Sequence, residues 1–232
     1  MTTPVVQTGR NRANVMTGAP DVRFSGGFWI GPAVTDPDMF PTDATTAPNV
    51  AAEAAGLTTA GFITSDGVTE SEDRSTEKIL DWNLDVIDVV ETDYGLQLTV
   101  TCAESANADV LKFIYGEENV TVTEPTADVP GQVHIRKGSR ELENGAVMFD
   151  IKGKGGAAGR GFGAEVQVQS VGEITYTKSS LIQYPLTIDV LNDVTGTYLH
   201  TWLTQRGTFE PEPESEPVED TPVEEFDVSD SE

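Results

Sequence analysis

Carboxylates supply most of the chemistry that this sequence could perform. Asp36, Asp38 and Asp43 lie in one proline-rich segment, and a second set of acids runs from Asp66 to Asp73. Oxygen ligands suit Ca²⁺, but the glycine and the terminal glutamate of a calcium loop are missing from the first segment, and oxygen ligands alone are a weak signal in the second. We therefore interpret them as solvated acidic loops and predict no metal site, although the pattern leaves calcium binding open.

The residues that most often act as nucleophiles or bases are few and scattered. His134 alternates with apolar neighbours in a predicted strand, and His200 has no second histidine or serine motif beside it. Cys102, the single cysteine, falls on the apolar side of an alternating stretch, which is typical of a buried thiol. Paired carboxylates could serve glycoside hydrolysis, but the aromatic residues are not clustered like a sugar-binding platform. The sequence predicts no catalytic residue, no cofactor and no enzyme.

A glycine-rich stretch has the spacing of a phosphate-binding loop. It reads KGKGGAAGRGFG and covers Lys152–Gly163. A dinucleotide fingerprint needs a helix after the glycines, whereas here the alternating sequence AEVQVQ predicts a strand. We therefore interpret the stretch as a flexible loop that joins two strands.

The net charge excludes several classes of partner. The chain of 232 residues has a formal charge of −25. The segment Glu210–Glu232 contributes 11 acids and no base, and the other residues still carry 28 acids against 14 Lys and Arg. Such a surface repels nucleic acid and anionic membranes. No stretch resembles a signal peptide or a membrane span, so we expect synthesis in a cytoplasm.

The acidic run leads into a pattern that predicts a long β-hairpin. Apolar and polar residues alternate from Leu80 to Val90 and again from Leu96 to Cys102. A period of two is typical of strands with one buried and one exposed face. Glu91–Gly95 is the predicted turn, and Trp82 would lie on the packed face.

The remaining segments predict a mainly β domain of roughly seven to nine strands with one flanking helix. That helix covers Ser105–Gly116 and is capped by Ser105 or Asn107. Asn49–Gly56 could form a second, short helix with Asn49 as its cap. Asn144-Gly145 is a strong signal for a β-hairpin.

Three regions follow from composition. Residues 1–20 form an extended N-terminal arm, residues 21–208 a β-barrel or β-sandwich domain, and residues 209–232 a disordered acidic tail. Within the domain, Pro32–Pro48 holds a long loop that we expect to be mobile in a free subunit, like the arm.

The order of these segments resembles the major tail tube proteins of bacteriophages with long, non-contractile tails, especially phages of actinobacteria. A strand ending in Ser-Asp-Gly-Val-Thr-Glu, an acidic connector and a charged strand with its Trp form the most specific block. The stretches that carry the resemblance read TGAPDVRFSGGFWIGP, PTDATTAPN, LTTAGFITSDGVTESEDRSTEKILDWNLDVI, ADVLKFIYGEENV, GAVMFDI and VGEITYTKSSLIQYPLTIDV.

The resemblance implies a structural virion protein, made in the host cytoplasm and built into the tail. Six subunits would close into a ring, and stacked rings would form a hollow tube. The tube would surround the tape-measure protein, meet the tail terminator and the baseplate or tail-tip proteins, and conduct double-stranded DNA without binding it specifically.

Two surfaces follow from combining this resemblance with the pattern. Polar hairpin residues would face the channel, namely Asp81, Asn83, Asp85, Gln97, Thr99 and Thr101. Met39 and Phe40, the large apolar pair of the long loop, would form the contact between rings. A phage decoration or host-recognition module with a β-sandwich fold is the alternative function, and it would remain monomeric or of low order.

Overall fold

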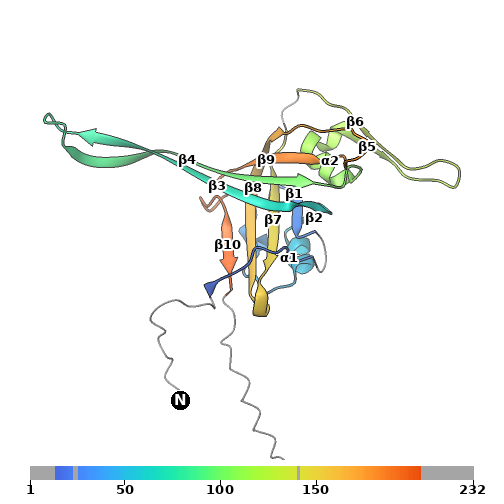
Figure 1. The fold of residues 1–232 in the computed structure, drawn as a ribbon, viewed down its shortest axis with the longest axis horizontal. Helices are drawn as coiled ribbons and strands as arrows, with labels where there is room; N and C mark the ends of the chain where they lie inside the picture. The colour runs from blue at the N-terminus through green and yellow to red at the C-terminus, as the bar shows by residue number, and fades with distance from the viewer. Residues whose placement is uncertain (1–13, 23–25, 140–141, 205–232) are drawn as a thin grey trace, which may run out of the picture.

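The structure is a computed structural model that describes residues 14–22, 26–139 and 142–204. Its main feature is an eight-stranded antiparallel sheet in the order β2-β1-β7-β8-β9-β4-β3, with β10 paired to β8 (Figure 1). A separate two-stranded sheet joins β5 to β6. The strands are β1 (Phe28–Pro32), β2 (Thr58–Thr59), β3 (Ile63–Leu80), β4 (Val86–Cys102), β5 (Val120–Thr123), β6 (Gln132–Ile135), β7 (Gly145–Lys152), β8 (Ala158–Val171), β9 (Tyr184–Val190) and β10 (His200–Leu203).

Two α-helices flank the main sheet. They are α1 (Pro48–Ala54) and α2 (Ala108–Tyr115), and short 3-10 turns occur at η2 (Pro37–Met39), η3 (Glu117–Asn119) and η4 (Lys154–Gly156). The prediction of a mainly β domain is confirmed. The described residues hold ten strands and two α-helices, more than predicted, and their main sheet stays open rather than closing into a barrel within one copy.

Strand β8 joins two halves of the sheet that run in different directions (Figure 1). Residues 158–163 of β8 pair with β7, and residues 159–162 also pair with β10 on the other side. Residues 166–171 pair with β9, and β4 and β3 continue that half. The half-sheet β8-β9-β4-β3 carries the surfaces described below.

One core layer lies between the two halves of the sheet and under α2. Leu96, Leu98, Val100 and Cys102 all point into it, as their alternation predicted. The Asn107 side chain caps α2 by accepting hydrogen bonds from the N–H groups of Asp109 (3.0 Å) and Val110. The helix then buries its apolar stripe, Val110, Leu111 and Ile114, on the sheet.

A second core layer lies on the other face of β1, β7 and β8. Alternation along β1 places Phe28 and Ile30 in the first layer and Trp29 in the second. Helix α1 covers the second layer with Ala51 and Ala52. Pro48 opens α1 and the residue before it is Ala47, so Asn49 is not the cap that the sequence suggested.

The glycine-rich stretch is mostly strand, which corrects the prediction of a flexible loop. Only the turn around η4 separates β7 from β8, and Gly159, Gly161 and Gly163 lie inside β8. A Cβ on Gly161 would lie 2.1 Å from the Phe149 ring. These glycines therefore make room for side chains of β7, and the lack of a following helix agrees with the rejection of a phosphate site.

The predicted position of the long hairpin's turn is wrong. β3 and β4 pair as far as Leu80 and Val86, and the chain reverses at residues 81–85. The Asp81 carboxylate accepts hydrogen bonds from the N–H groups of Asn83 (2.9 Å) and Asp85 (2.8 Å), which stabilises this turn. Glu91–Gly95 instead lies within β4, and Trp82 at the tip is fully exposed at 103%.

Asn144-Gly145 does not form a hairpin turn. Type I′ turns need a positive φ at both central residues, and Gly145 has none. It opens β7, where a Cβ would lie 2.5 Å from the Phe113 ring. The glycine is therefore explained by close packing of α2 on β7.

The long loop after β1 is anchored to the sheet, contrary to the expectation of a mobile segment. The buried Arg160 guanidinium donates hydrogen bonds to the carbonyl oxygens of Asp43 and Thr46, each at 2.9 Å. Its Nε also pairs with the buried Asp150 carboxylate at 2.7 Å. Phe40 of the same loop packs edge-on against Phe162, with ring centroids 5.3 Å apart.

Candidate functional site

One face of the half-sheet β8-β9-β4-β3 is polar along its whole width. Residues opposite one another on paired strands share a face, so the registers define this surface. It consists of Thr69, Ser71, Asp73 and Ser75 on β3, Asp93, Gln97, Thr99 and Thr101 on β4, Pro185, Thr187 and Asp189 on β9, and Gln167, Gln169 and Ser170 on β8. We call this set the polar sheet face. It includes no Lys, no Arg and no large apolar side chain.

Hydrogen bonds across strands fix the centre of the polar sheet face. The Gln97 side-chain amide on β4 donates to the Asp189 carboxylate on β9 at 2.8 Å and to Gln169 on β8 at 3.4 Å. The other face of the same strands is the first core layer. The half-sheet is therefore amphipathic, with one apolar face packed in the subunit and one polar face open.

The structure divides the residues that we predicted to line a channel. Gln97, Thr99 and Thr101 lie together on the polar sheet face. Asp81, Asn83 and Asp85 lie in the turn at the hairpin tip, because the chain reverses there, and they are not part of that face. The alternation in EVQVQS and TIDV is the sequence signal that would have added the polar residues of β8 and β9.

Both edges of the polar sheet face are free among the described residues. β3 pairs with β4 alone, so its outer edge presents unpaired backbone groups. At the opposite edge, residues 167–171 of β8 pair only with β9, because β7 leaves β8 at Val166. Free edges of this kind are templates for pairing with another chain.

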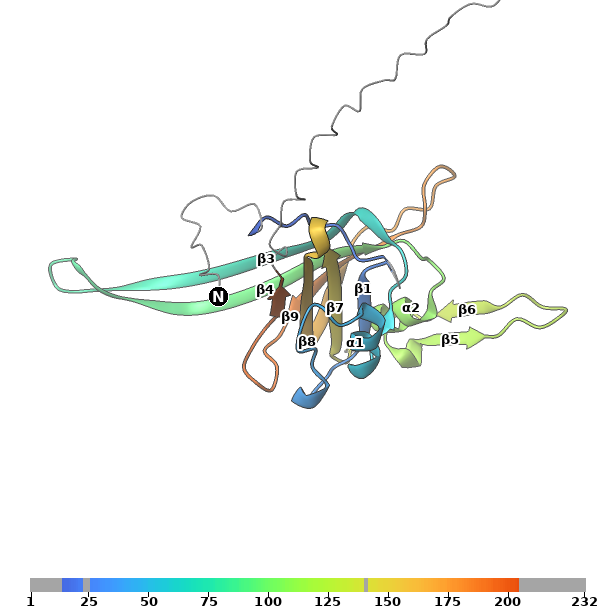
Figure 2. The ribbon, with the colours of Figure 1, turned by 90° about the horizontal axis from the view of Figure 1, so that it is seen from below.

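The outer half of the β3–β4 hairpin projects beyond the domain as a two-stranded ribbon (Figures 1 and 2). We call residues 76–91 the projecting ribbon. β9 stops at Val190, opposite Leu96, so nothing in the sheet supports the ribbon beyond that point. Eight large apolar side chains are exposed along it, namely Ile79, Leu80, Trp82, Leu84, Val86, Ile87, Val89 and Val90. Isolated two-stranded hairpins are marginally stable in water, and an apolar surface of this extent is typical of an interaction site.

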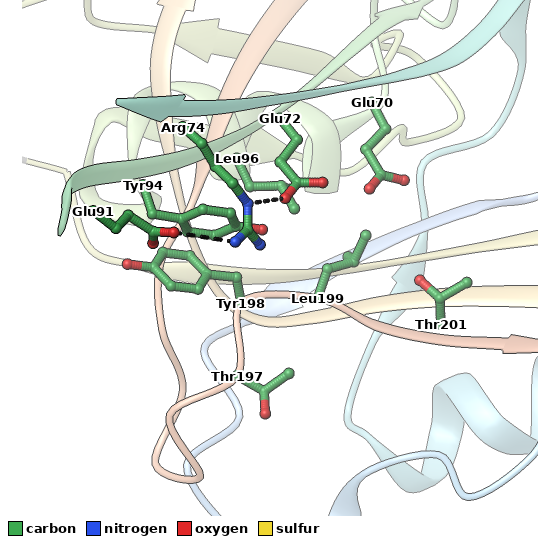
Figure 3. Close-up of a pocket in the computed structure, with 10 residues that line it drawn as sticks. All are labelled: Glu70, Glu72, Arg74, Glu91, Tyr94, Leu96, Thr197, Tyr198, Leu199 and Thr201. Atoms are coloured by element: carbon green, nitrogen blue, oxygen red, sulfur yellow. Dashed lines mark hydrogen bonds and ion pairs between the residues drawn. The ribbon is translucent and has the colours of Figure 1, made fainter. Parts of the chain in front are cut away.

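An aromatic and ionic cluster holds the base of the ribbon. The Arg74 guanidinium bridges the carboxylates of Glu72 (2.9 Å) and Glu91 (3.1 Å). It also lies 4.8 Å above the Tyr94 ring, which packs edge-on against Tyr198 at 4.7 Å (Figure 3). The hydrogen bond to Glu72 raises the pKa of Arg74, and burial raises the pKa of Tyr94. The cluster lines a cleft of about 570 Å³ between the ribbon base and the segment before β10.

The predicted contact pair of the long loop is split between the interior and the surface. Phe40 packs within the subunit against Phe162 and His200. Met39 remains partly exposed beside the end of α1. Of the two residues, Met39 is the one whose side chain is open to another subunit.

His200 and Cys102, two of the residues considered as possible bases or nucleophiles, have structural surroundings in the subunit. The His200 Nε2 lies 2.7 Å from the Asp193 carboxylate, whose pKa is lowered by hydrogen bonds from Thr195 and His200 against the effect of burial. Burial raises the pKa of Cys102 to about 12. In the part of the chain that the structure describes, no group of three or more His, Cys, Asp and Glu residues is placed to hold a metal ion. No helix there is long and apolar enough to cross a membrane.

Comparison with known protein families gives one match. The sequence fits the family described as phage tail tube protein over residues 25–213, which is more than half of the chain. No curated protein matches the chain.

Proposed function

The chain belongs to the phage tail tube protein family, and from this premise we propose that six copies close into a ring and that stacked rings form the tube of a long, non-contractile tail. Membership of the family makes the protein a structural component of the virion tail that acts as part of a tube. The observation that supports the ring is the polar sheet face with its two free edges.

In the proposed ring, β3 of one copy pairs with the outer edge of β8 in its neighbour. Each copy then contributes the four strands β8, β9, β4 and β3 to one continuous barrel. Closing a sheet on itself removes every exposed edge. A monomeric binding module, in contrast, would leave both edges unpaired.

The polar sheet face lines the channel in this arrangement. Double-stranded DNA carries one negative charge for about every 1.7 Å of its axis. A wall of Thr, Ser and Gln side chains with a few carboxylates offers no cation to hold a phosphate. Gln97, Thr99 and Thr101 would therefore let the genome slide past during delivery, and the same wall would surround the tape-measure protein during assembly.

Thiol labelling of assembled protein tests both parts of this proposal. Thr99→Cys places a thiol on the polar sheet face, and Glu53→Cys places one on the exposed side of α1, as a control. In tubes, a small maleimide should label both variants, whereas a bulky polymer-linked maleimide should label only the control. Wild-type protein that stays monomeric at every concentration would contradict tube formation and favour the binding module. Equal labelling of both variants by the bulky reagent would show that the polar sheet face is not the channel wall.

A further inference from the structure

Strand β7 crosses the subunit beneath the half-sheet, from one free edge toward the other. It begins at Gly145, beside the point where the outer edge of β8 becomes free. Its last residues lie near the start of β3. The Asp150 N–H donates to the Gly27 carbonyl oxygen at 2.9 Å, and a Cβ on Gly26 would lie 1.8 Å from the Gly61 carbonyl oxygen. Figure 2 shows β7 running across the direction of β3 and β4, with the turn after β7 on the β3 side.

The turn after β7 is a narrow projection with a positive charge. We call residues 152–156, which read Lys-Gly-Lys-Gly-Gly, the basic turn. Its last two glycines have positive φ values of 71° and 80°, so the chain reverses there without further side chains. Lys152 and Lys154 are exposed, and neither has an ion-pair partner among the described residues. The neighbouring acids Asp21 and Asp150 are buried within the subunit.

An acidic cleft lies at the opposite end of β7. Its volume is about 640 Å³, and it separates α2 and η3 from residues 142–145 and the end of β1. Lys112 lines it and pairs with Glu117 at 3.3 Å, and Arg136 lies at its margin, where it donates to the Glu118 carbonyl oxygen. Four carboxylates against these two cations leave a formal charge of −2. The four acids are Asp109, Glu117, Glu118 and Glu143.

The wall of the acidic cleft leaves room for a narrow turn. Four of its lining residues are glycines, which have no side chain to fill the space. They are Gly31, Gly56, Gly116 and Gly145. Thr58 adds a small polar side chain. The cleft therefore suits a glycine-rich segment whose only long side chains are cationic, which is the composition of the basic turn.

The proposed ring brings the two ends of β7 together in neighbouring copies. In that ring, β3 of one copy pairs with the outer edge of β8 in the next. The basic turn lies on the β3 side of its own subunit, and the acidic cleft lies beside the free edge of β8. Each copy therefore directs its basic turn toward the acidic cleft of the next copy.

We propose that the basic turn of one copy inserts into the acidic cleft of its neighbour in the same ring. This inference rests on the proposed function, since it adds a second contact outside the barrel wall to the copies that the barrel joins. A contact between two different patches on identical subunits closes when the rotation completes a ring. Opposite charges across it favour this orientation between chains that otherwise repel one another.

Zero-length crosslinking of the wild-type chain tests the contact. A carbodiimide activates a carboxylate, and an amine in contact with it then forms an amide and releases the reagent as a urea. The reagent is applied to tubes assembled from isotope-labelled and unlabelled chains. We expect peptides of mixed isotope content that join Lys152 or Lys154 to acids of the cleft, above all Glu143. Covalent multimers on a denaturing gel should end at six copies, because the contact stays within a closed ring.

The outcomes separate this inference from the proposed function. Tubes without these peptides would overturn the contact while leaving the tube intact. Lysine crosslinks only to the acidic tail, or only within one chain, would overturn it as well. Multimers of more than six copies joined through these peptides would show that the turn connects rings instead. Failure of the wild-type protein to form any ring would contradict the proposed function.

Charge exchange gives an independent readout. Lys154→Glu should lower the yield of rings several-fold, and Glu143→Lys should do the same, whereas the double variant should recover most of the yield. Lys178→Glu, in the loop between β8 and β9, makes the same charge change at another exposed lysine. It is the matched control and should assemble normally. Equal losses in Lys154→Glu and Lys178→Glu, or no recovery in the double variant, would overturn the pairing.

Discussion

At the scale of single residues, Arg160 shows how one side chain connects distant parts of the chain. Its guanidinium is 1% exposed and joins Asp150 on β7 to the carbonyl oxygens of Asp43 and Thr46 in the long loop. A buried guanidinium with these partners cannot be recognised from sequence, because the loop is more than one hundred residues away. The sequence therefore predicted a mobile loop where the structure has an anchored one.

Replacing Arg160 should both destabilise the domain and release the loop. Breaking a buried ion pair by removing one partner costs about 3–5 kcal/mol. Arg160→Ala should therefore lower the melting temperature markedly. Amide hydrogen exchange should also become faster in residues 32–48. Arg160→Lys keeps the charge but loses the planar guanidinium group. Its stability should therefore lie between those of the wild-type protein and Arg160→Ala. Unchanged exchange in the loop of a folded Arg160→Ala variant would show that other contacts hold it.

Cys102 provides a probe of the core at the same scale. Burial raises its pKa to about 12, with a smaller contribution from Glu104. Because the reactive species is the thiolate, native protein at pH 8 should react very slowly with a thiol reagent. Reaction should become fast in denaturant. Fast labelling of native protein would mean that β4 separates readily from β9.

At the scale of elements, the hairpin shows what a period of two can and cannot predict. The alternation from Leu96 to Cys102 correctly predicted a strand with a buried face. The alternation from Leu80 to Val90 also lies largely in strand, but the apolar residues there cover nothing within the subunit. Periodicity reports the local conformation, whereas burial depends on which elements lie opposite, and β9 is too short to support the ribbon.

Because Trp82 lies exposed at the hairpin tip, its replacement should affect folding much less than the sequence suggested. On the packed face that the sequence suggested, Trp82→Asp would prevent folding. In the observed turn it should change the stability of the monomer by no more than about 0.5 kcal/mol, as surface substitutions usually do. Leu98→Ala, in the core beneath the same hairpin, is the contrast and should cost about 2–5 kcal/mol. Thermal melts of the monomers measure both, and a large loss for Trp82→Asp would show that the tip packs on its own subunit.

At the scale of the whole molecule, some features depend on local sequence pattern and others on how distant segments are placed. The fold class, helix α2 and the amphipathic half-sheet could all be predicted from sequence, because each depends on local pattern. The exposure of the projecting ribbon and the anchoring of the long loop could not, since they depend on where β9 ends and on contacts of Arg160 with distant segments. The acidic tail, residues 209–232, lies outside the described residues, so its sequence alone supports the expectation that it is disordered.

Deleting residues 209–232 should leave the stability of the domain unchanged and alter its assembly. The segment is rich in acid and proline and has too few apolar groups to offset the entropy of ordering. Removing it takes away 11 negative charges per copy. In a ring these charges would repel those of neighbouring copies, and salt would screen the repulsion. Raising the salt concentration should therefore speed assembly of the full chain more than that of the truncated chain.

The same salt titration separates the tail from the rest of the acidic chain. The residues outside the tail still carry 28 acids against 14 Lys and Arg, so salt also screens the repulsion between truncated chains. Light scattering of both proteins at matched concentration gives the rate of assembly as a function of salt concentration. We expect this rate to rise more steeply with salt for the full chain than for the truncated chain. Equal slopes would mean that charges elsewhere on the acidic body, rather than the tail, limit assembly.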